Sequence, residues 1–338
     1  MKKNRNNFNS RSAAENELQK LIDENKYNEA VSLLYKQQAE SWPLLKEGLL
    51  SLESVQIKKF FFDGYEIHVQ HNPRRINSTT AIVSKERLKN IKCILCVENL
   101  PGSEVAINYK DKYNILCNPY PIFLEHLTIS RKEHIPQRIT NSFKYLLQIS
   151  NDFSDFALIY NGPEAGASVP VHQHFQACKK YSLPVENDFE GLKNEYGERL
   201  QNKNASVFAI DDGLRKFISI ESDSSQHIEN IFNKIYEIYS HISVNHLEPM
   251  MNVLCSYDRE TGWRVLIFFR GKHRPEAYFK EGEANILVSP ATIDIGGVLI
   301  TPLEKDFKKL NKKKISQIFR EVIIGKEEFE YLKSILKE

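Results

Sequence analysis

The sequence lacks a surplus of charge of either sign. It has 46 Lys and Arg against 44 Asp and Glu, a formal net charge of +2 over 338 residues. Such a balance gives no electrostatic footprint for nucleic acid or for an anionic membrane, so neither partner is expected. Nucleotides stay open as ligands, because they need a few placed donors and no basic face.

Long apolar runs are also missing. The stretch IKCILCVENL (91–100) is much too short to span a bilayer. The polar start MKKNRNNFNSRSAAE is followed by no apolar stretch, so no signal peptide is expected.

Cysteine is scarce. The five thiols are Cys93, Cys96, Cys117, Cys178 and Cys255. An odd, sparse set is typical of a reducing compartment, which predicts a cytoplasmic protein. A chain of this length can bury a core without disulfides or metals, so a bound metal would stabilise one local site and would not be required for the fold as a whole.

The apolar pattern changes along the chain. Residues 1–13 are polar and predict disorder, and residues 14–54 have helical spacing and predict a helical N-terminal segment. From Val55 the pattern predicts strands, beginning with a hairpin around Asp63-Gly64. Residues 311–338 are rich in Lys and Glu and predict C-terminal helices.

One order of elements occurs twice. Helix, strand, turn and strand are expected at about 136–177 and again at 225–270. This predicts the α+β class: a duplicated unit with a mainly antiparallel sheet and flanking helices. A first half at 55–180 would be catalytic, and a second half at 181–310 would be degenerate because it lacks the histidines. The segments CILC, YNILC and FLEHLTIS are expected to be strands of the first half.

The stretch VHQHFQA (171–177) concentrates the chemistry. On a strand, His172, His174 and Gln176 project from one face, about 6.5–7 Å apart. The residues before it are small or offer a hydroxyl: Gly162, Gly166, Ala167 and Ser168. Small residues let backbone N–H groups approach a phosphate, and neutral imidazole can attack phosphorus and later leave it. The alternative is an amphipathic strand whose polar face carries two histidines by chance.

Other candidates are weaker alone. The pair Cys93-x-x-Cys96 fits zinc, a redox pair or coincidence, and zinc would need two further ligands. Arg75 lies in the loop NPRRINST, and the segment FFRGKHRPEAY groups further basic residues, among them Arg270, Lys272 and Arg274. Arginine suits phosphate, but exposed basic loops are usually only solvated.

The segment N-G-P-E-A-G-A-S-x-x-x-H-x-H-F-Q resembles the active-site segment of the histidine triad superfamily, in its nucleotidyltransferase and phosphorylase branch. That branch includes galactose-1-phosphate uridylyltransferase, diadenosine tetraphosphate phosphorylase and the GDP-hexose phosphorylases. The hydrolase branch has a third histidine where this chain has Gln176, and HQHFQA with LPVE (183–186) is most similar to the GDP-hexose phosphorylases. The resemblance implies that His174 attacks the α-phosphorus and Gln176 hydrogen-bonds the phosphoryl oxygens. It implies that Asn161 and Ser168 position His174 and the phosphates, beside the small Gly166 and Ala167.

The same resemblance implies a structural zinc. Its ligands would be Cys93, Cys96, His134 and His172, with His126 as a rival for the third place. Asn118 and Tyr120 would contact the nucleoside. No organic cofactor is implied, and a homodimer is one form the protein could take.

The activity so implied is nucleotidyl transfer. The donor would be a nucleoside diphosphate sugar, of the GDP-hexose type, or a dinucleoside polyphosphate, and the acceptor would be phosphate or a sugar phosphate. Two alternatives stay open: a nucleotide hydrolase of the same superfamily, and a catalytically silent nucleotide-binding protein.

Overall fold

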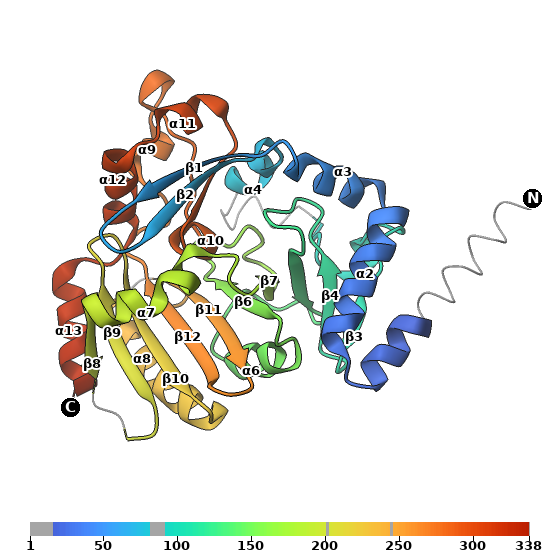
Figure 1. Ribbon diagram of the computed structural model, residues 1–338, viewed down its shortest axis with the longest axis horizontal. Helices are drawn as coiled ribbons and strands as arrows, with labels where there is room; N and C mark the ends of the chain where they lie inside the picture. The colour runs from blue at the N-terminus through green and yellow to red at the C-terminus, as the bar shows by residue number, and fades with distance from the viewer. Residues whose placement is uncertain (1–15, 82–91, 201–202, 244–245, 338) are drawn as a thin grey trace, which may run out of the picture.

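The computed structural model describes residues 16–81, 92–200, 203–243 and 246–337 (Figure 1). The tail predicted to be disordered, residues 1–13, lies outside the described residues. The helices are α2 (Tyr27–Ser41), α3 (Pro43–Leu52), α4 (Ile76–Thr79), α6 (Phe143–Asp152), α7 (Pro184–Tyr196), α8 (Ser225–Ile242), α9 (Glu276–Phe279), α10 (Thr292–Ile295), α11 (Glu304–Lys309), α12 (Lys312–Val322) and α13 (Lys326–Lys337). No helix in the described part of the chain has the length and apolar character needed to cross a membrane.

In the described part of the chain, ten strands form one continuous antiparallel sheet. They are β3 (Ile107–Tyr109), β4 (Tyr113–Cys117), β5 (Leu127–Arg131), β6 (Phe156–Asn161), β7 (His174–Lys179), β8 (Gly197–Leu200), β9 (Ser206–Asp211), β10 (Lys216–Ser222), β11 (Met251–Asp258) and β12 (Gly262–Phe269). Their order across the sheet is β3-β4-β5-β7-β6-β11-β12-β10-β9-β8.

This order is a duplication. Each half contributes five strands. From the edge to the centre of the sheet, the first half runs β3-β4-β5-β7-β6 and the second half runs β8-β9-β10-β12-β11, so in both halves the last two strands along the chain are exchanged in position. A helix precedes the fourth strand in each half, α6 before β6 and α8 before β11. The halves meet where β6 pairs with β11, and α6 and α8 stack Phe143 on Phe232 with ring centroids 3.6 Å apart. The predicted α+β class with a duplicated, antiparallel unit is confirmed.

A smaller sheet lies beside the large one (Figure 1). The predicted hairpin forms its first two strands, β1 (Gln56–Phe61) and β2 (Glu66–His71), and β13 (Val298–Thr301) pairs parallel to β2. Gly64 turns the hairpin with a φ of 75°, a conformation that costs other residues more. Because β13 comes from the C-terminal part of the chain, this sheet brings the segment 289–297, which contains α10, back to the first half.

Helices close both ends of the large sheet. At one end α2 packs on β4, with Ala30, Val31 and Leu34 buried on its inner face. At the other end α13 packs on β8 and α8. Figure 1 shows these helices at opposite sides of the molecule.

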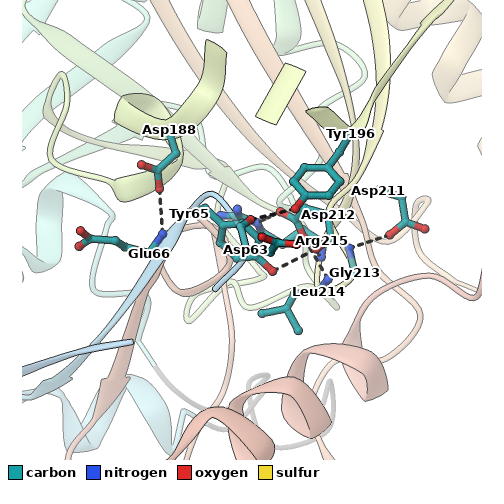
Figure 2. A network of polar contacts seen from close by, with 10 residues as sticks. All are labelled: Asp63, Tyr65, Glu66, Asp188, Tyr196, Asp211, Asp212, Gly213, Leu214 and Arg215. Carbon is teal, nitrogen blue, oxygen red and sulfur yellow. Dashed lines mark hydrogen bonds and ion pairs between the residues drawn. The ribbon is translucent and has the colours of Figure 1, made fainter. Parts of the chain in front are cut away.

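A buried ion pair ties the second half to the hairpin (Figure 2). Arg215 Nε lies 2.5 Å from Asp212 Oδ2, and neither side chain is exposed. Asp212 Oδ1 also accepts the backbone N–H groups of Leu214 and Arg215. The Arg215 guanidinium lies over the Tyr65 ring at 4.6 Å, and the Tyr65 hydroxyl donates to the Asp212 carbonyl. The turn between β9 and β10 is therefore clamped to the β1–β2 hairpin.

Three expectations about single elements were wrong. The segment CILC is a turn and not a strand, because its two thiols must point to one place. The helix expected from Pro136 begins at Phe143, since the side chain of Gln137 is used elsewhere, as described below. Strand β7 begins at His174, which leaves His172 in the turn before it.

Candidate active site

His174 is held as one neutral tautomer. Its Nδ1 lies 2.8 Å from the His172 carbonyl, which can only accept, so Nδ1 carries the proton and Nε2 keeps its lone pair. The side chain is only 3% exposed, and burial lowers the pKa of its imidazole to about 4. At neutral pH the ring is therefore an uncharged nucleophile with a fixed orientation.

Gln137 holds the backbone on both sides of this histidine. Its amide oxygen accepts the His174 N–H at 2.8 Å, and its amide nitrogen donates to the carbonyls of His174 and Asn161. Gln137 is 1% exposed, so this clamp is shielded from water. A helix starting at Pro136 would not leave this side chain free to bridge β6 and β7.

The orientation of Gln176 is set by His126. The backbone N–H of Ile122 donates to His126 Nδ1 at 3.2 Å, which places the ring proton on Nε2. His126 Nε2 then donates to Gln176 Oε1 at 3.0 Å. Burial, with the charge of Arg75, lowers the pKa of His126 to about 3, so the ring stays neutral. The Gln176 amide nitrogen is consequently the end left to donate to a ligand.

The small-residue loop packs closely against a distant segment. Gly166 has a φ of 97°, and a Cβ there would lie 2.6 Å from the Ala291 Cβ. Asn161 Oδ1 accepts from Asn252 Nδ2 and from the backbone N–H and hydroxyl of Thr292. These contacts join β6, the second half and the segment 289–297 around the start of the loop.

Two adjoining cavities meet at Gln176, and His174 lines one of them. The polar one is lined by Arg75, Asn161, Gly166, Ala167, Ser168, Gln176, His273, Arg274, Ser289 and Asp294, among others. The more apolar one, of about 300 Å³, is lined by Leu95, Leu100, Glu104, Leu116, Asn118, Pro119, Tyr120, Thr128 and His174, among others. Arg75, Ser78, Ser168 and Gln176 border both. A volume of this size is in the range of small-ligand pockets.

The basic residues of the second half divide into two groups. Arg274 lines the polar cavity, with Nε donating to Ser289 Oγ at 2.9 Å. Arg270 is 1% exposed and donates to Asn252, and to the carbonyls of Val322 and Pro290, so it lies behind the cavity wall. Lys272 is exposed and faces Glu276 across 3.9 Å. The structure brings Arg75 and Arg274 to the cavities, and it does not bring Arg270 or Lys272 there.

The four predicted metal ligands lie together. The ligand atoms of Cys93, Cys96, His134 and His172 are all within 4.8 Å of one another. Cys96 Sγ lies 3.1 Å from His134 Nδ1, Cys93 Sγ lies 3.3 Å from His172 Nδ1, and the two Nδ1 atoms are 3.2 Å apart. These separations are close to the edges of a zinc tetrahedron with Zn–S of about 2.3 Å and Zn–N of about 2.0 Å.

The protein also prepares these ligands. His172 Nε2 lies 2.6 Å from the Arg131 carbonyl, which fixes the proton there and leaves Nδ1 free for a metal. The cluster could therefore bind a metal ion, and its donor set fits structural zinc. His126, the rival ligand, is instead hydrogen-bonded to Gln176.

Sequence reasoning missed several of these groups. Gln137 and Glu104 gave no motif signal, and His126 was weighed only as a zinc ligand. His273 lines the polar cavity, and in the sequence it stands out only as a member of the basic segment FFRGKHRPEAY. The role of Gln137 could not be predicted from the sequence, because its partners are backbone atoms of two strands that follow it in the chain.

Two family models and several curated proteins match parts of this chain. Residues 34–179 match a family described as "Domain of unknown function (DUF4922)", and residues 198–338 match one described as "GDPGP1-like, C-terminal domain". The galactose-1-phosphate uridylyltransferase of Caldanaerobacter subterraneus is 29% identical over 112 residues, covering 28% of this chain and 21% of the relative. The enzyme of the same name from Clostridium perfringens is 29% identical over 102 residues, covering 25% and 20%. The match thus spans about a fifth of the length of these relatives.

A solved structure shares the fold over most of the chain. The crystal structure of yeast Ap4A phosphorylase Apa2 superposes with a TM-score of 0.56 at 14% identity, covering 83% of this chain and 96% of that one. At this identity the likeness shows a shared fold, and the uridylyltransferase matches support the resemblance of the chain to the nucleotidyltransferase and phosphorylase branch of the histidine triad superfamily.

Proposed function

We propose that the protein is a nucleotidyltransferase that works through a covalent nucleotidyl-His174 intermediate. The observation that carries the proposal is the single tautomer of His174, which lines the apolar cavity together with Gln176, a residue that borders both cavities. The donor would be a nucleoside diphosphate sugar of the GDP-hexose type or a dinucleoside polyphosphate. The matches to uridylyltransferases and to the GDPGP1-like domain support this class.

In the first step, His174 Nε2 forms a bond to the α-phosphorus while the bond from that phosphorus to the bridging oxygen breaks. The leaving sugar phosphate keeps the bridging oxygen and its electron pair. Gln176 donates to the phosphoryl oxygens, which gain charge in the transition state. The His172 carbonyl, which accepts from Nδ1–H, stabilises the positive charge that the ring gains.

In the second step, an oxygen of the acceptor attacks the same phosphorus and the N–P bond breaks. Inorganic phosphate or a sugar phosphate is already anionic, whereas water would have to lose a proton. Gln176 cannot take that proton near neutral pH, so phosphorolysis or transfer is favoured over hydrolysis. Arg75 and Arg274 would hold the leaving and the accepting phosphate in the polar cavity.

Zinc would be held by Cys93, Cys96, His134 and His172 and would brace the chain next to the nucleophile. His172 links that cluster to the reaction, because its own carbonyl is the group that orients His174. Arg270 would support the wall of the polar cavity from behind.

Product analysis tests the proposal. The protein is incubated with nucleoside diphosphate sugars and dinucleoside polyphosphates, with and without inorganic phosphate. We expect nucleoside diphosphate to form only when phosphate is present. Free nucleoside monophosphate without phosphate would instead show a hydrolase, and tight binding without any turnover would show a silent binding protein.

A further inference from the structure

Glu104 is a carboxylate in apolar surroundings that the proposed reaction does not use. Among the described residues that line the apolar cavity it is the one acid, and Leu95, Leu100 and Leu116 are among its neighbours there. Its backbone N–H is fixed by the Pro101 carbonyl at 2.9 Å. Leu116 and Cys117, the last two residues of β4, line the same cavity as Glu104.

The ionised carboxylate of Glu104 is unfavourable in the protein without a ligand. Burial raises the pKa of Glu104 to about 7, which means that its surroundings oppose the charge. Within the described part of the chain, the side chain makes no hydrogen bond and no ion pair that would offset this cost. A half-buried acid left in this state inside a cavity indicates a donor supplied by a ligand.

The sheet order shows which part of a nucleotide would reach Glu104. His174 and Gln176 lie on β7, Thr128 pairs with Gln176 on β5, and β4 is the next strand. Adjacent strands are about 4.8 Å apart, so β4 lies roughly 10 Å from the nucleophile. Asn118, the residue after β4, donates to Thr128 Oγ1 and lines the same cavity as His174 and Glu104. A nucleotide that lies along this cavity with its α-phosphorus at His174 would place its ribose beside Asn118 and its base beside Glu104.

The hydrogen-bonding pattern of the bases then decides between them. Guanine presents two adjacent donors, N1–H and the N2 amino group, which match the two oxygens of a carboxylate. Adenine and cytosine present a donor next to an acceptor, and uracil presents N3–H between two acceptors. We propose that Glu104 is the base-reading residue of this site and selects guanine through N1–H and N2–H. This proposal rests on the proposed function, because it needs a nucleotide in this cavity.

Equilibrium binding tests the proposal without turnover. Dissociation constants for GDP, IDP, XDP, ADP and UDP are measured by calorimetry, without phosphate, on the full chain. The variants are Glu104→Gln and, as a matched control, Glu53→Gln, which alters an exposed carboxylate beyond α3. The glutamine at 104 keeps the shape and removes no contact within the protein, so folding is expected to survive.

For the wild type and the control we expect GDP to bind about 10- to 100-fold more tightly than IDP, which lacks the N2 amino group, as suits one hydrogen bond to a charged acceptor. Glu104→Gln should lose this preference and favour XDP, whose C2 carbonyl can accept from the new amide. A merely structural role would not produce that exchange.

Three results would overturn the inference: no measurable binding of GDP, a wild-type preference for ADP or UDP, or an equal loss for all five nucleotides in Glu104→Gln. Equal loss would assign Glu104 to the ribose hydroxyls, which every nucleotide shares. The proposed function is tested by a separate measurement, in which a nucleotide donor is added and covalent nucleotidylation of His174 is detected. If His174 becomes nucleotidylated by a uridine donor and by no other donor, the proposed function stands and guanine selection is refuted. If GDP binds selectively but no donor nucleotidylates His174, guanine selection stands and the proposed function is refuted.

Discussion

Because His126 donates a hydrogen bond to Gln176, we expect two amide substitutions, His126→Asn and His126→Gln, to affect the reaction rate differently. In His126→Asn, the side-chain oxygen replaces Nδ1 and still accepts the Ile122 N–H, but the donor to Gln176 is lost. In His126→Gln, the longer amide places a nitrogen near the old Nε2 and keeps that donor, but loses the acceptor for Ile122. Comparing the two variants therefore distinguishes the effect of Gln176 amide orientation on the rate from the effect of altered packing at position 126.

The magnitude follows from what the amide does. Without its partner, Gln176 can turn its oxygen toward the phosphoryl group, which removes a donor from the transition state. Loss of such a donor costs about 10²–10³ in rate when it is complete, and much less if the amide only samples both orientations. We therefore expect His126→Asn to slow nucleotidyl-enzyme formation by about 10- to 100-fold, and His126→Gln by only about threefold.

Single-turnover labelling, followed by rapid quench, measures this rate directly. Denaturant unfolding of both variants should show comparable losses, because each removes one buried hydrogen bond worth about 1–3 kcal/mol. Adding Gln176→Ala to His126→Asn should cost little more than Gln176→Ala alone. Equal rates in the two His126 variants, or full additivity in the double variant, would refute the orienting role.

Three further predictions concern stability. Purified protein should contain about one zinc per chain, and Cys93→Ser should lower both the zinc content and the melting temperature; well under one zinc in the wild type would contradict the metal site. Asp212→Ala should lower the free energy of unfolding by about 3–5 kcal/mol, because it leaves the buried Arg215 charge unpaired, and a loss under about 1 kcal/mol in urea unfolding would refute that role. Burial raises the pKa of Glu248 from 4.5 to about 7, so the folded state holds this proton more tightly and stability should fall as pH rises from 4.5 to 7. Glu248→Gln should remove about 3 kcal/mol of that fall, and an unchanged pH dependence would show that Glu248 is not its source.

Much of the fold follows from local sequence signals. The hairpin at Asp63-Gly64, the apolar run of β6 and the repeated helix–strand–strand order were all predictable, because each is a local pattern. The continuity of the ten-stranded sheet was not, since no pattern in β6 or β11 says that these two strands pair with each other. Strand pairing of this kind is decided by long-range packing.

The site shows the same division. The motif placed His174 and Gln176 next to each other, and the resemblance supplied the set of metal ligands that the structure gathers. The contacts that orient these groups come from Gln137 and His126, whose roles depend on backbone atoms brought in by other strands. The residues of CILC favour a strand, whereas the convergence of the two thiols requires a turn.

Intact-protein mass spectrometry tests the central claim most directly. The wild type is mixed with a nucleoside diphosphate sugar in the absence of phosphate and quenched at alkaline pH, where a phosphoramidate survives. We expect a mass gain of one nucleotidyl group on the wild type, located at His174 and discharged by inorganic phosphate, and no gain on His174→Ala. Equal gain on both proteins, or no gain on the wild type with any donor tried, would contradict it.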